Sequence, residues 1–191
     1  MKLSVLIPVY NERRTLQEIV SRVLAQQIPG IDKMELVIVD DCSTDGTREI
    51  LAEMEAEFPG VIRVILLEQN QGKGNAISTA IQAATGDLGI IQDADLEYDP
   101  GEYAAVLQPI LEGAADVVYG SRFADHQERR VLYFRHAIVN KFLTFLSNFF
   151  TDLNLTDMET CYKAFRMQIA KTIPIRSKRF SELMPTMKAS D

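Results

Sequence analysis

The sequence predicts an α/β fold in which a mostly parallel sheet carries helices on both of its faces. Short apolar runs of strand type alternate with stretches of helical type from the N-terminus onward. That alternation is typical of parallel sheets covered by helices. In addition, several of the apolar runs end in acidic or polar residues. Open α/β sheets bind their ligands beyond the carboxyl ends of the strands, so these residues are the first candidates for a site.

The chain opens with a strand followed by a helix. Residues 3–9 form an apolar run of the buried-strand type. Asn11 is expected to cap a helix over 13–26, which ends near the Pro29-Gly30 pair. A second strand is expected over 34–39, and it delivers Asp40-Asp41 to the same edge of the sheet.

A second helix, a third strand and a third helix follow. The turn-forming residues after Asp41 include Ser43 and Asp45, either of which would cap a helix that ends near residue 58. A strand is expected over 61–67 and a helix over 76–84.

The loop 69–75, between that strand and that helix, is polar and contains two glycines around Lys73. Its spacing matches neither a Walker A loop nor the dinucleotide-binding fingerprint. A helix N-terminus beside a lysine would still attract an anion such as a phosphate. The alternative is a flexible turn with a solvated lysine.

The stretch Ile91-Gln92-Asp93-Ala94-Asp95-Leu96-Glu97 is central to the interpretation. A buried strand over 88–91 delivers Asp93 and Asp95, whose side chains have the same parity and are expected to face the same crevice. Carboxylate oxygens suit Mg²⁺ or Mn²⁺, which proteins bind through one or two carboxylates together with substrate phosphates. The alternative is a solvated acidic turn.

The next elements are a helix and a strand. Pro100 is at the first position of an expected helix that ends near residue 112, where proline is favoured, and Pro109 is expected to kink it. A strand over 116–119 then runs into Arg122. An arginine there is either a surface ion pair or part of a clamp for a diphosphate.

The following region changes in character. Residues 124–136 are polar and charged and are interpreted as a mobile loop, whereas 138–150 has aromatic and aliphatic residues at helical spacing. This helix is either a core helix or an interfacial one, with its apolar face against lipid and nearby basic residues against phosphate. A last strand is expected over 162–166.

Composition limits the class of protein. The chain has 191 residues, enough for one large domain, with 47% hydrophobic and 25% charged residues, as in soluble globular proteins. Its net charge of -7 argues against nucleic-acid binding. The two cysteines are expected to be reduced, in a cytoplasmic protein. The N-terminal apolar run is too short for a signal peptide, and no run reaches the roughly 20 residues of a spanning helix.

Six motifs, in order over residues 3–170, resemble the family-2 inverting glycosyltransferases of the GT-A fold, and among them the polyprenyl-phosphate (dolichol-phosphate) mannosyl- and glucosyltransferases. The motifs are Ile7-Pro8-Val9-Tyr10-Asn11-Glu12, Val39-Asp40-Asp41 with Ser43-Thr44-Asp45-Gly46-Thr47, Asn70-Gln71-Gly72-Lys73-Gly74, Asp93-Ala94-Asp95-Leu96-Glu97, Gly120-Ser121-Arg122-Phe123 and Thr160-Cys161-Tyr162-Lys163-Ala164-Phe165-Arg166. The resemblance implies a Rossmann-like GT-A domain over residues 1–180, shortened at its C-terminus, with an irregular tail over 181–191.

The resemblance also implies roles for individual residues. For the donor nucleotide these are Pro8, Tyr10, Glu12, Asp40, Lys73 and Asp93. The metal, Mg²⁺ or Mn²⁺, would be held by Asp93 and Asp95, with Glu97 next to them. The residues for the acceptor phosphate are Arg122, Arg135 and Lys163, with Arg129 and Arg130 as further candidates. Asp93, Asp95 and Arg122 would form the catalytic set.

The implied reaction is the inverting transfer of a hexose to a polyprenyl or dolichyl phosphate, by a peripheral protein at the cytoplasmic face of the membrane. GDP-mannose is the first candidate donor and UDP-glucose the second. A cation at Asp93 and Asp95 would stabilise the departing diphosphate. A phosphate monoester, with its second pKa near ~6, is largely dianionic at pH 7 and needs no protein base. A saccharide hydroxyl would need one, for which Asp157 and Glu159 are candidates.

Three other functions stay open at this point. The first is transfer to a saccharide hydroxyl in capsule or cell-wall synthesis, and the second is a non-catalytic module that binds nucleotide sugars. The third is a phospho-acceptor receiver domain, since 37–41 also resembles a strand ending in an acidic pair. It is disfavoured because the strand over 61–67 is not followed by a phosphorylatable aspartate.

Overall fold

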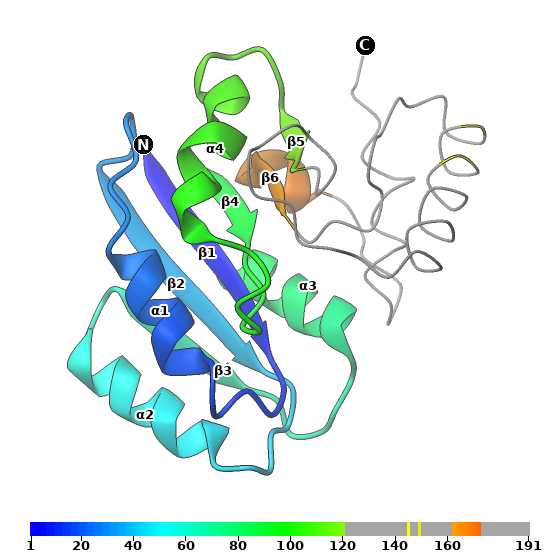
Figure 1. The fold of residues 1–191 in the computed structure, drawn as a ribbon. Helices are drawn as coiled ribbons and strands as arrows, with labels where there is room; N and C mark the ends of the chain where they lie inside the picture. The colour runs from blue at the N-terminus through cyan, green and yellow to red at the C-terminus, as the bar shows by residue number, and fades with distance from the viewer. Residues whose placement is uncertain (121–144, 146–148, 150–161, 173–191) are drawn as a thin grey trace.

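The structure is a computed structural model that describes residues 1–120, 145, 149 and 162–172 (Figure 1). The strands are β1 (Lys2–Val9), β2 (Lys33–Asp40), β3 (Ile62–Leu66), β4 (Leu88–Ile91), β5 (Val117–Tyr119) and β6 (Lys163–Arg166). The helices are α1 (Leu16–Leu24), α2 (Thr47–Glu57), α3 (Lys73–Ala83), the 3-10 helix η1 (Pro100–Glu102), α4 (Tyr103–Leu111) and α6 (Met167–Ala170).

The strands form one sheet in the order β3-β2-β1-β4-β6-β5. β1 pairs in parallel with β2 and with β4, and β3 pairs in parallel with β2, whereas β6 is antiparallel to both of its neighbours. The chain therefore runs outward from β1 to β3 and then returns to add β4 on the other side of β1. This reversal of strand order makes the carboxyl ends of β1 and β4 the expected place for a ligand.

Helices cover both faces of the sheet, as Figure 1 shows, with α1, α2 and α4 on one face and α3 on the other. The first face buries residues such as Ile19, Leu51 and Leu107, and the second buries Ile77 and Ile81 against the opposite side of the same strands. Strands buried on both faces explain why their sequences are almost continuously apolar.

The expected elements among the described residues are confirmed, with boundaries that differ by at most three residues. Two predicted caps are wrong. The cap of α1 is Thr15, while Asn11 has a φ of 58° and accepts a hydrogen bond from the Thr44 N–H at 2.9 Å. The cap of α2 is Gly46, although Asp45 does accept from the N–H of Thr47 at 3.1 Å. Asn11 and Asp45 instead link the loop after β1 to the loop after β2, because Asn11 accepts from Thr44 and Asp45 accepts from the Arg13 N–H.

Some expectations fall on residues outside the described ranges. They are the loop 124–136, most of the helix 138–150 and the tail 181–191. Within the described residues, no helix combines the length and the apolar character needed to cross a membrane.

Candidate active site

A pocket of about 400 Å³ lies at the carboxyl ends of β1 and β4, where the strand order reverses. Its lining combines carboxylates, a lysine, an amide and an aromatic ring. The lining residues are Pro8, Val9, Tyr10, Glu12, Asp41, Asn70, Gly72, Lys73, Ala76, Asp93, Ala94 and Asp95. Six of the predicted site residues are therefore brought together here: Pro8, Tyr10, Glu12, Lys73, Asp93 and Asp95.

Asp93 and Lys73 form an ion pair inside this pocket. The Lys73 Nζ lies 2.6 Å from Asp93 Oδ1 and 2.8 Å from Oδ2. Asp93 follows β4 and is only 8% exposed, while Lys73 is the first residue of α3. The lysine thus partly neutralises the buried carboxylate, and it stands at the positive end of a helix.

The Asp95 carboxylate accepts the N–H of Glu97, within its own turn, at 3.0 Å. Desolvation raises the pKa of Asp95, and the nearby carboxylates of Asp93 and Glu97 raise it further. The carboxylates of Asp93, Asp95 and Glu97 thus repel one another, while Lys73 and the Glu97 N–H act in the opposite direction. A divalent cation at this turn would relieve the repulsion.

The donor set suits Mg²⁺ or Mn²⁺, since two carboxylates face one pocket with space for phosphate oxygens. Among residues 1–120, 145, 149 and 162–172, no three acidic, histidine or cysteine side chains are grouped as metal ligands. Glu97 is exposed and does not line the pocket, so the structure does not bring it to Asp93 and Asp95 as a third ligand.

The two acidic residues after β2 have different surroundings. Asp40 is fully buried, accepts from Arg48 Nε at 2.6 Å and from the Ser43 N–H, and does not line the pocket. Asp41 does line it, and its two oxygens accept the N–H groups of Gln71 and Gly72 at 2.7 Å each. Of these two aspartates, Asp41 is therefore the one that lines the pocket.

The loop before α3 is shaped by this contact. Gly72 has a φ of 89°, a backbone conformation that side chains disfavour, and in it both amides point at Asp41. Asn70 Nδ2 donates to the carbonyl of Asp41 at 3.2 Å. The predicted loop is therefore fixed to the end of β2, and α3 begins at Lys73, earlier than expected.

The proposed acceptor residues are not assembled by the described part of the chain. Arg122, Arg129, Arg130 and Arg135 lie outside the described residues. Lys163 is 2% exposed, with its Nζ 5.7 Å from the centre of the Tyr119 ring, and it does not line the pocket.

Three residues at the site were given no role by sequence reasoning: Asp41, Asn70 and Gln92. Asp41 and Asn70 were within recognised motifs. The register between β1 and β2 ends with the pair Val9 and Asp40, so Asp41 is the aspartate that lies beyond the end of the strand. Gln92 is fully buried beside Asp93 and makes four hydrogen bonds. The sequence feature that could have identified Gln92 is a polar residue at the end of an apolar strand.

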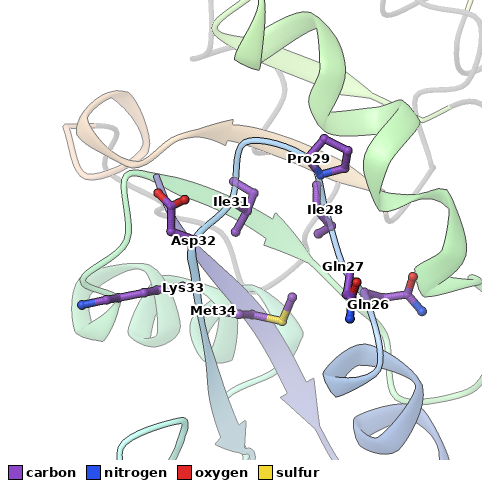
Figure 2. A pocket seen from close by; sticks show the side chains of 8 residues that line it. All are labelled: Gln26, Gln27, Ile28, Pro29, Ile31, Asp32, Lys33 and Met34. Carbon is purple, nitrogen blue, oxygen red and sulfur yellow. The ribbon is translucent and has the colours of Figure 1, made fainter.

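A second hollow, of about 580 Å³, opens at the other end of β2 and is lined by residues 26–34 (Figure 2). Its charged residues are Asp32 and Lys33, and Asp32 pairs with the N-terminal amine at 2.6 Å. A single continuous segment forms its lining, without the paired carboxylates of the first pocket. Of these two pockets, the one at the carboxyl edge is therefore the better candidate for a functional site.

Comparison with curated proteins finds transferases that act on lipid phosphates. The chain is 36% identical over 123 residues to a dolichol-phosphate mannosyltransferase from Pyrococcus furiosus, covering 64% of this chain and 34% of that protein. It is 33% identical over 172 residues to an undecaprenyl-phosphate 4-deoxy-4-formamido-L-arabinose transferase from Photorhabdus laumondii, covering 90% of this chain and 51% of that protein. The chain thus spans between a third and a half of these relatives.

Comparison with solved structures finds GT-A glycosyltransferases. The crystal structure of S. aureus TarS 1-349 matches with a TM-score of 0.63 and 25% identity, covering 98% of this chain and 54% of that one. Glucosyl-3-phosphoglycerate synthase from Mycobacterium tuberculosis, solved with Mn²⁺ and UDP-glucose, matches with a TM-score of 0.65 and 21% identity, covering 88% and 57%. The predicted α/β fold of the GT-A type is confirmed.

The family model named Glycosyl transferase family 2 matches residues 4–173, which include every motif on which the resemblance rested. Together with the sheet order and the pocket at its point of reversal, this match shows that the chain belongs to glycosyl transferase family 2.

Proposed function

We propose that this chain transfers a hexose, with inversion, from a nucleotide sugar to a polyprenyl phosphate. The observation that carries the proposal is the placement of Asp93, Asp95 and Lys73 in one pocket with the residues at the ends of β1 and β2. The names of the relatives from Pyrococcus and Photorhabdus support a polyprenyl-phosphate acceptor. GDP-mannose is the first donor to test and UDP-glucose the second.

The nucleotide would lie along the β1 and β2 side of the pocket. Tyr10 is 51% exposed, so its ring is available to a base or ribose, and Pro8 and Glu12 border the same space. Asp41 would take the role that the sequence suggested for Asp40, because Asp41 lines the pocket whereas Asp40 does not and is held by Arg48.

The diphosphate would lie on the β4 side. A divalent cation bound to Asp93 and Asp95 would stabilise the negative charge that develops on the departing diphosphate. Lys73 would contact a phosphate oxygen beside Asp93, because its ammonium group carries three N–H donors. Arg122, Arg129, Arg130, Arg135 and Lys163 stay proposed contacts of the acceptor phosphate and Glu97 a proposed further metal ligand.

Membrane contact is part of the proposal, at the cytoplasmic face. Phe145 and Phe149 have helical backbone and are 64% and 72% exposed. Residues four apart lie on the same face of a helix, so these two rings present a joint apolar surface. Aromatic side chains of this kind insert at the boundary between headgroups and acyl chains.

The test is calorimetric titration of the chain with GDP, UDP, GDP-mannose and UDP-glucose, each with Mn²⁺ and with EDTA. Metal-dependent binding of one nucleotide is expected, followed by sugar transfer to a short-chain polyprenyl phosphate. Transfer to a soluble saccharide in the absence of lipid phosphate would contradict the proposed acceptor. Donor binding without transfer to either acceptor would contradict the proposed reaction and leave a binding module.

A further inference from the structure

The buried side chain of Gln92 holds together the turn that carries Asp93 and Asp95. Its Nε2 donates to the carbonyl of Asp93 at 2.9 Å and to the carbonyl of Tyr98 at 3.3 Å. These carbonyls are at the two ends of the turn. One amide group therefore bridges the two ends of the loop 93–98.

The other end of the amide is fixed by two phenols. Gln92 Oε1 accepts from the Tyr103 hydroxyl at 2.8 Å and from the Tyr162 hydroxyl at 3.3 Å. Burial raises the pKa of both phenols, so they remain protonated donors at all ordinary pH values. The Tyr162 ring also packs against Tyr98, with ring centres 4.7 Å apart.

The four partners define a single orientation of the amide. Backbone carbonyls only accept hydrogen bonds, so Nε2 must face Asp93 and Tyr98, and the hydroxyls then donate to Oε1. If the amide were rotated by half a turn, Oε1 would face the two backbone carbonyl oxygens, and none of the three could donate a hydrogen bond. Because every polar atom of this fully buried group has a partner, the network favours one geometry.

The turn needs such support, since its backbone is strained. Leu96 lies between Asp95 and Glu97 and has a φ of 63°, in the left-handed region that residues with a side chain disfavour. Strained conformations persist where the surrounding structure holds them, and they are frequent at functional sites. Here the bonds of Gln92 to both ends of the turn hold it.

We propose that Gln92 is a positioning residue that presets the Asp93 and Asp95 carboxylates for the cation and diphosphate of the donor. The inference rests on the proposed function for its ligand and on the hydrogen-bond network for its mechanism. Groups that hydrogen-bond metal ligands typically change metal affinity about 10-fold to 100-fold when they are replaced. Gln92 would act on the carboxylates through the backbone of the turn that carries them.

The test compares Gln92→Met with Ser4→Ala. Gln92→Met keeps the size of the side chain but removes all four bonds. Ser4→Ala removes two hydrogen bonds of a buried hydroxyl at the opposite edge of the sheet, one to Glu35 and one from the Gly86 N–H, and serves as the control. Two quantities are measured: the affinity for Mn²⁺ with GDP or UDP, and hydrogen exchange of the Glu97 amide in metal-free protein, relative to global unfolding.

Gln92→Met is expected to weaken Mn²⁺-dependent nucleotide binding by about 10-fold or more and to speed exchange of the Glu97 amide, which is bonded to Asp95. Ser4→Ala should change neither. Equal affinity and equal exchange in the two variants would overturn the inference. If the wild type binds no nucleotide, the proposed function fails, while the exchange measurement still decides whether Gln92 holds the turn.

A milder variant covers the case in which Gln92→Met does not fold. Tyr103→Phe with Tyr162→Phe removes both donors to Oε1 and leaves both carbonyl bonds of Nε2. A smaller increase in Glu97 exchange is expected, because the amide is then fixed at one end. No increase would contradict the role of the network.

Discussion

Glu35 and Asp95 are acidic residues at opposite edges of one sheet, and their surroundings act on them in opposite directions. Burial would raise the pKa of Glu35, but hydrogen bonds from Lys2, Ser4 and Thr85 lower it to about 2. Desolvation and two neighbouring carboxylates raise the pKa of Asp95. At the amino edge, the Glu35 carboxylate is therefore used to stabilise the fold. At the carboxyl edge, the Asp95 carboxylate remains available to a ligand.

The opposite pKa shifts follow from the hydrogen-bond donors around each carboxylate. Glu35 accepts from Lys2 Nζ and Ser4 Oγ at 2.5 Å each, and from the N–H groups of Thr85 and Gly86 at 2.6 and 3.1 Å. These donors come from β1 and from the turn before β4, so the carboxylate ties three strands together. At the other edge, the Asp95 carboxylate accepts an N–H that belongs to its own turn.

The largest expected effect is that of Asp95→Ala on binding. We expect Mn²⁺-dependent nucleotide binding to fall at least about 100-fold, because one of two proposed metal ligands is lost. Titration calorimetry with and without EDTA measures it. Asp116→Ala, which removes an exposed ion pair with Arg166 at the end of β6, is the control and should bind normally. Unchanged binding by Asp95→Ala would remove the metal site from the proposal.

The second effect concerns Glu35→Gln, which should lower the free energy of unfolding by about 2 kcal/mol, since charge-assisted hydrogen bonds are lost in a partly buried site. Urea unfolding measures it. The same variant should bind nucleotide as the wild type does. If Glu35→Gln lost nucleotide binding but kept its free energy of unfolding, the amino edge would contribute to binding, and the proposed division of roles between the two edges would be wrong.

The third effect is a dependence on pH. The pKa of Glu35 falls from 4.5 to about 2 on folding, so its contribution to stability is complete above pH 4.5 and is lost as the pH falls toward 2. The stability difference between wild type and Glu35→Gln should therefore shrink over that range. Unfolding curves at a series of pH values measure it, and a constant difference would refute the assigned cause.

The smallest effect is that of Asp95→Asn on metal-free stability. A raised pKa means that the ionised carboxylate is disfavoured in the folded state, so the amide should raise stability at pH 7, by no more than about 0.5 kcal/mol at this exposed position. With Mn²⁺ and nucleotide present, the order should reverse, because the ligand stabilises the wild type. Thermal unfolding with and without these ligands checks both signs.

The sequence was sufficient for the fold and for the general location of the site. Alternating strand and helix patterns predicted the elements of residues 1–120, and the position of Asp93 after a buried strand predicted the edge of the sheet at which it lies. Both signals depend only on residues that are close together in the sequence, so the sequence alone reveals them.

Long-range geometry accounts for what the sequence did not predict. Whether Asp40 or Asp41 reaches the pocket depends on the register between β1 and β2 and on Arg48, which comes from α2. The role of Gln92 depends on Tyr103 and Tyr162, which are distant in sequence and meet only in the fold. Neither relation is visible in a motif.

The antiparallel strand β6 has a consequence for how the protein is made. It lies between β4 and β5, although it follows both in the chain. A ribosome therefore releases β1 to β5 before the strand that joins β5 to the rest of the sheet exists, and pairings between distant segments are slow to form. Tyr162, which completes the network around Gln92, arrives with this strand. The carboxylate turn thus acquires its final support late in synthesis, when most of the sheet is already able to fold.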